Sequence, residues 1–92
     1  MYIFQKNFLE RIGMSKKLKQ DISIGANLRR LRKQSGLSQE KAAAQLQLVG
    51  IDISREIISQ MELGNYSIRV SVLRALKDIY QIDSFDEFFR GL

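Results

Sequence analysis

One face of a helix predicted over residues 54–63 carries side chains that can form hydrogen bonds with DNA bases. At about 100° per residue, its polar side consists of Arg55, Glu56, Ser59 and Gln60. Arginine can bind guanine, glutamine can bind adenine, glutamate can accept from cytosine, and serine is permissive. Because an α-helix fits the major groove, we expect this face to contact base edges. A plain amphipathic surface helix has the same pattern, so the arrangement of residues around this helix leaves that alternative open.

The opposite face of the same helix is apolar. It consists of Ile58 and Met61, with Ile57 on the flank. Such a two-sided helix buries one stripe against a core and exposes the other.

Positive charge is concentrated ahead of this helix. The chain has 92 residues and a net charge of +5. Residues 14–36 contain only one acidic residue, Asp21, against the basic residues Lys16, Lys17, Lys19, Arg29, Arg30, Arg32 and Lys33. A patch of this kind suits a polyanionic partner, although a solvated basic helix face would look the same.

The composition argues against several other classes of function. The chain has no cysteine and no histidine, so the commonest zinc ligands and the usual nucleophile–base pairs are missing. We therefore expect no catalytic residues, no metal site, no cofactor and no small-molecule substrate. No apolar run approaches the roughly 20 residues of a membrane span, and no secretory leader is evident. We expect a cytoplasmic protein.

The chain is predicted to be all-α. It has no proline and lacks the alternating patterns and hairpin turns of strands. Residues 21–92 are assigned to one helical domain. Residues 1–20 are assigned to a basic N-terminal extension that is either helical or disordered.

Five helices are expected within the domain. The first has an apolar face of Ile24, Leu28 and Leu31 and ends at Gly36. Ser38 caps the second helix, whose narrow apolar face is Ala42, Ala43 and Leu46. Residues 47–53 are expected to extend the second helix by a turn and then bend.

The remaining helices have similar signals. Ser54 caps the third helix, which stops at Gly64. A fourth helix is predicted over residues 71–80. Ser84 and Glu87 have the spacing of a capping box that opens a fifth helix.

Two segments resemble the Cro/repressor-type, or Xre-like, helix-turn-helix family. They are Ile24-Gly-Ala-Asn-Leu-Arg-Arg-Leu-Arg-Lys-Gln-Ser-Gly-Leu-Ser-Gln-Glu40 and Ile57-Ile-Ser-Gln-Met-Glu-Leu-Gly64, and the resemblance covers about residues 22–90. It implies a five-helix, lambda-repressor-like bundle whose second and third helices bind double-stranded DNA. The link between these two helices is about five residues longer here than the family's tight turn.

The resemblance also implies roles for individual residues. The base-facing set would be Arg55, Glu56, Ser59 and Gln60. The residues at the DNA backbone or at the edge of the site would be Ser38, Gln39, Asn65 and Arg69. Arg32 and Glu62 would form a structural ion pair between the first and third helices.

The expected function is that of a sequence-specific DNA-binding regulator of transcription, acting as a homodimeric repressor. Two half-sites would lie about 34 Å apart. The dimer surface would come from Phe85, Phe88 and Phe89 or from the N-terminal extension, unless these phenylalanines complete the monomer core. The competing hypothesis is a protein-interaction bundle, antitoxin-like or peptide-binding, that does not bind DNA.

Overall fold

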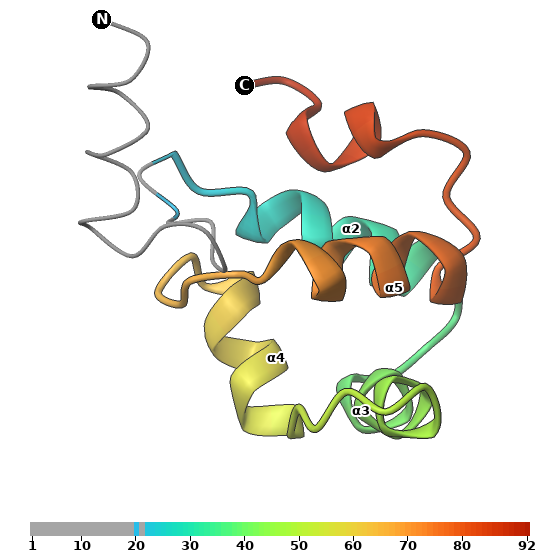
Figure 1. The fold of residues 1–92 in the computed structure, drawn as a ribbon. Coiled ribbons are helices and arrows are strands. Elements are labelled where there is room, and N and C mark those ends of the chain that lie inside the picture. Colours follow the sequence, from blue (N-terminus) through green and yellow to red (C-terminus); the bar gives the residue numbers. More distant parts are fainter. Residues whose placement is uncertain (1–19, 21) are drawn as a thin grey trace, which may run out of the picture.

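The computed structural model describes residue 20 and residues 22–92. Within this part, every regular element is a helix, which confirms the all-α fold class (Figure 1). The elements are α2 (Gly25–Gln34), α3 (Gln39–Leu48), α4 (Arg55–Glu62), α5 (Val70–Ile79) and the 3₁₀-helix η1 (Phe85–Phe89). The expectations for residues 1–19 lie outside the described residues.

Short local signals set the boundaries of the helices. The Ser38 hydroxyl accepts from the Lys41 backbone N–H at 3.1 Å, and the Ser54 hydroxyl accepts from that of Ile57 at 3.3 Å. Both predicted N-caps are therefore confirmed. Gly36 and Gly64 follow the ends of α2 and α4 with positive φ angles of 81° and 80°, a conformation that favours glycine.

The link between α3 and α4 is ordered by a defined turn. The Ile51 N–H donates to the Leu46 carbonyl at 2.9 Å, and the Gly50 N–H donates to that of Gln47 at 3.0 Å. This pair of bonds is a Schellman motif, with Gly50 in the left-handed conformation at φ 85°. The predicted bend is confirmed, but α3 ends at Leu48, so the predicted extra turn of helix is only partly formed.

A single core joins the helices. α4 packs against both α2 and α3, α3 packs against α5, and η1 packs against α2. In Figure 1, α4 extends from the side of α3 toward α2 and α5. The largest fully buried side chains are Phe88, Leu28, Leu46, Ile58, Met61, Ile68, Leu76 and Val72. The core thus holds α4 by its buried face and leaves the opposite face exposed to solvent.

The fifth helix differs from its prediction. It is a five-residue 3₁₀-helix, and the Ser84 hydroxyl accepts from the Asp86 N–H at 3.1 Å instead of completing a capping box with Glu87. The Glu87 carboxylate instead lies 3.6 Å from Arg30 of α2. The lambda-repressor-like count of five α-helices is therefore not confirmed for the described residues.

The three phenylalanines of η1 have different environments. Phe88 is fully buried and completes the core. Phe85 and Phe89 are about half exposed, at 45% and 49%. The core interpretation holds for Phe88 alone.

Candidate nucleic-acid interface

The outer face of α4 presents four polar side chains to solvent. Ile58 and Met61 are each 2% exposed, so the opposite face is buried as the wheel predicts. The polar set comprises three exposed residues and one partly buried serine: Arg55, Glu56, Gln60 and Ser59. The structure thus brings the predicted base-facing residues together on one free helix surface.

Arg55 and Glu56 lie next to each other at the start of this face. The Arg55 Nη2 is 4.0 Å from the Glu56 Oε1, and the two side chains are 50% and 73% exposed. An ion pair this open to water contributes little to stability. Both side chains are therefore free to exchange this contact for another partner.

The N-terminus of α3 flanks α4. The Ser38 hydroxyl caps α3. Gln39 is partly buried, and its Nε2 donates to the Glu62 Oε1 at 3.1 Å. Gln39, predicted to lie at the edge of the DNA site, is thus tied to the last residue of α4.

Arg32 and Glu62 meet between α2 and α4. The Arg32 Nε donates to the Glu62 Oε2 at 2.6 Å, its Nη2 donates to Oε1 at 3.0 Å, and its Nη1 donates to the Leu37 carbonyl at 2.9 Å. The hydrogen bond with Glu62 raises the pKa of Arg32 above its ordinary value. This geometry is a buried, bidentate ion pair that holds the two helices together.

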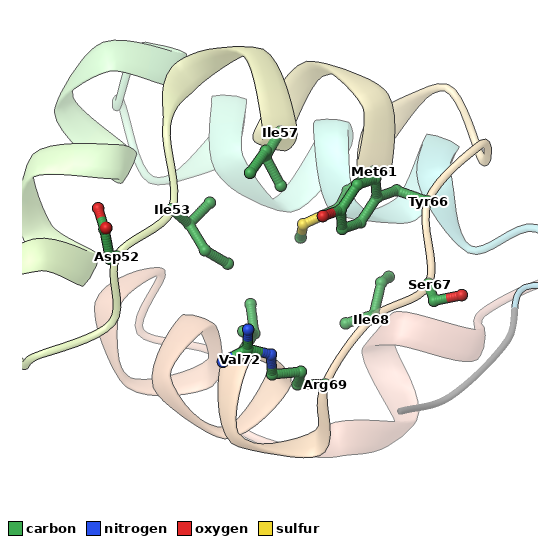
Figure 2. A pocket seen from close by; sticks show the side chains of 9 residues that line it. All are labelled: Asp52, Ile53, Ile57, Met61, Tyr66, Ser67, Ile68, Arg69 and Val72. Atoms are coloured by element: carbon green, nitrogen blue, oxygen red, sulfur yellow. The ribbon is translucent and has the colours of Figure 1, made fainter. Parts of the chain in front are cut away.

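The segment between α4 and α5 carries the two predicted backbone contacts. Asn65 and Arg69 are both exposed, and Arg69 is the residue at the N-cap of α5. The Asn65 N–H donates to the Gln60 carbonyl at 3.0 Å. Asn65 therefore lies directly after the C-terminal end of α4, whereas Arg69 lies at the start of α5, beside Val72 (Figure 2).

A small hollow lies between α4 and this segment (Figure 2). Its volume is about 50 Å³, far below the roughly 300 Å³ of a small-molecule site. Ile53, Ile57 and Ile68 point into it, and Arg69 lies at its edge. The lining is mixed, because Asp52, Ser67 and Arg69 border the hollow together with the apolar side chains.

The basic patch of the sequence is divided by the fold. Arg32 is buried against Glu62, and Arg30 faces Glu87 with its Nη2 also donating to the Glu87 carbonyl at 3.3 Å. Arg29 and Lys33 remain exposed on α2. The pairing of Arg32 with Glu62 is the one implied by the family resemblance, whereas Arg30 leaves the expected basic surface for Glu87.

Gln20 is a contact residue that sequence reasoning missed. It belongs to the predicted N-terminal extension, yet its side chain forms hydrogen bonds with the backbone at and after the end of α4. Its Nε2 donates to the carbonyls of Tyr66 at 2.7 Å and Met61 at 3.3 Å. No pattern in the sequence marks it, because a lone glutamine carries no periodic signal.

No cluster of three or more acidic, histidine or cysteine side chains is placed to hold a metal ion among residues 20 and 22–92. Over the same residues, every helix is too short or too polar to cross a membrane.

Comparison with known families gives one match. A family model described as a helix-turn-helix domain matches residues 23–87. Comparisons with curated proteins and with solved structures found no match for the chain. The matched range contains α2 to α5 and every site residue predicted from the sequence.

Proposed function

The chain belongs to the helix-turn-helix domain family, and from this premise we propose that it is a sequence-specific regulator of transcription that binds double-stranded DNA. The outer face of α4 enters the major groove. The observation that carries this proposal is the free polar surface of α4, which a buried apolar face and the Arg32–Glu62 pair hold in place.

The proposed contacts divide into two kinds. Base edges are read by Arg55, Glu56, Ser59 and Gln60. The DNA backbone is held at the flanks by Ser38, Gln39, Asn65 and Arg69. Backbone contacts set the position of the protein on the duplex, and base contacts supply selectivity.

The finer proposal is a cytoplasmic repressor of the Cro/repressor-type, Xre-like branch that binds as a homodimer. α4 has only eight residues, so one copy reads few base pairs, and a second half-site about 34 Å away would extend the operator. Phe85 and Phe89 are candidates for the dimer surface because they are half exposed. We propose that the protein acts by binding alone, without catalysis or a cofactor.

The test begins with selection of bound sequences from random duplex DNA, followed by fluorescence anisotropy on the selected duplex. The double variant Arg55→Ala/Gln60→Ala is expected to lose the preference for the selected duplex. The matched control is Arg74→Ala/Gln34→Ala, which changes exposed residues of the same types on α5 and α2. Absence of duplex binding at low salt by the folded protein would refute the proposal.

A protein-interaction bundle is the second candidate. Arg55 is the only basic residue of α4, and Glu56 opposes it. For this candidate, the Arg55→Ala/Gln60→Ala variant would keep its affinity for a protein partner. Loss of duplex selectivity in that variant argues against the candidate.

A further inference from the structure

We propose that Gln20 is a positioning residue for the segment of residues 63–69, through which Asn65 and Arg69 reach the DNA backbone. This inference rests on the proposed function and deepens it. It adds a residue ahead of α2, and ahead of the family match over residues 23–87, to the machinery of DNA binding.

The Gln20 side chain joins three separate pieces of backbone. Its Nε2 donates to the Tyr66 carbonyl at 2.7 Å and to the Met61 carbonyl at 3.3 Å. Its Oε1 accepts from the Ile24 N–H at 3.1 Å. A primary amide has two N–H donors and one acceptor oxygen, so each polar atom of the amide has a partner in this arrangement.

These bonds act on the segment between the two predicted backbone contacts. At one end of this segment, the Asn65 N–H is held by the Gln60 carbonyl at 3.0 Å. Towards the other end, Ile68 is 1% exposed and anchored in the core. Between these anchors, Gln20 holds the Tyr66 carbonyl. The amide therefore fixes the curvature of the segment from which Asn65 and Arg69 project.

The chemistry of the site explains why a glutamine serves here. Glutamate has the same length, but it lacks the two N–H groups that donate to the Met61 and Tyr66 carbonyls. Methionine fills a similar volume without forming these bonds. Positioning matters because a binding group displaced by more than about 0.5 Å from its productive geometry loses much of its contact.

The test measures binding of the full chain to a random-sequence duplex of about 20 base pairs, because phosphate contacts do not depend on sequence. Gln20→Met is compared with the wild-type protein and with Gln34→Met, an exposed glutamine of α2. We expect Gln20→Met to weaken binding about tenfold and to reduce the slope of log affinity against log salt by about 0.9, the value of one phosphate contact. Gln34→Met should change neither quantity.

A double-mutant cycle separates positioning from a general loss of structure. If Gln20 acts by aiming Arg69, Gln20→Met should cause little further loss in an Arg69→Ala background. An equal loss in both backgrounds would overturn the inference. Hydrogen exchange in the free protein adds a second readout, since Gln20→Met should speed exchange of the Ile24 amide.

The two proposals fail in different ways. Unchanged affinity and salt slope in Gln20→Met, with normal binding by the wild-type protein, would overturn the role of Gln20 alone. If the folded wild-type protein binds no duplex at low salt, the proposed function fails and this inference fails with it.

Discussion

Arg32 of α2 and Glu62 of α4 form a bidentate ion pair in which the side chains are only 8% and 5% exposed. The same carboxylate accepts a hydrogen bond from Gln39 at the start of α3. One buried carboxylate therefore links all three helices around the proposed DNA-binding surface. The orientation of α4 relative to α3 depends on this network as well as on apolar packing.

Glu62→Ala is expected to lower the free energy of unfolding by about 3–5 kcal/mol, because it leaves the Arg32 guanidinium buried without its partner. The double variant Arg32→Met/Glu62→Leu should be more stable than this single variant, since it removes both charges and keeps the volume apolar. Urea denaturation of the three proteins measures both differences.

The more exposed Arg30–Glu87 pair serves as the control. The Arg30 Nη2 and the Glu87 Oε1 are 3.6 Å apart, and the Arg30 and Glu87 side chains are 30% and 39% exposed. Glu87→Ala should therefore cost less than about 1 kcal/mol. Equal costs for Glu87→Ala and Glu62→Ala would contradict the importance given to burial of the Arg32–Glu62 pair.

Gly25 sits where α2 crosses the end of α4, and a Cβ at this position would overlap the Glu62 carbonyl oxygen. Backbone atoms cannot move aside as a flexible side chain can. Gly25→Ala should lower the free energy of unfolding by about 1–3 kcal/mol through overpacking and weaken duplex binding by shifting α4.

The control is Ala26→Ser, which also adds one heavy atom, at an exposed position of the same helix. It should change the free energy of unfolding by no more than about 0.5 kcal/mol. Thermal unfolding and anisotropy check both variants, and equal effects would contradict the steric argument.

The features of the fold that sequence could predict come from local signals. Ser38 and Ser54 cap the helices that follow them, and Gly36 and Gly64 end α2 and α4. The two-sided character of α4 follows from periodicity within eight residues. Such features involve neighbours in the chain, so residue type and spacing are sufficient to predict them.

The unpredicted features depend on partners far apart in the chain. Gln20 bonds to residues 41 and 46 positions away, and no local pattern indicates such a pairing. Glu87 has the spacing of a capping box, but it faces Arg30 of α2 instead. Tertiary contacts therefore decide the form of η1, and they also draw Arg30 away from the expected basic surface.

Tyr80 should make the protein sensitive to alkaline pH. Burial raises the pKa of Tyr80, with a smaller contribution from the Glu62 carboxylate. In the unfolded chain, tyrosine loses its proton near pH 10, while the folded state retains it. The unfolded state then binds fewer protons, so stability is complete below about pH 10 and falls as the pH rises above it.

The measurement is the free energy of unfolding of the wild-type protein and Tyr80→Phe between pH 8 and pH 11, values that bracket the ordinary tyrosine pKa of about 10. All other residues are the same in both proteins, so the difference between the two curves isolates Tyr80. The wild-type protein should lose stability relative to Tyr80→Phe above about pH 10. Tyr66→Phe, at an exposed tyrosine, should follow the wild-type curve. A constant difference across the range would contradict the effect of burial.

Glu56 is expected to limit non-specific binding, since its 73% exposed carboxylate lies beside Arg55 on the face proposed to enter the groove. Glu56→Gln removes a charge that repels phosphates and frees Arg55 for them. Affinity for a random duplex should rise, and the slope of log affinity against log salt should steepen by up to about 0.9. Selectivity for an operator obtained by selection should fall, because glutamine prefers adenine where glutamate accepts from cytosine.

Asp78→Asn is the matched control for this prediction. It makes the same charge change at an exposed position of α5, so it raises the net charge equally without altering α4. If the gain in non-specific affinity came from net charge alone, both variants would show it to the same extent. A larger gain in Glu56→Gln, measured by anisotropy at several salt concentrations, would locate the effect at α4. Equal gains would show that the outer face of α4 does not approach the phosphates.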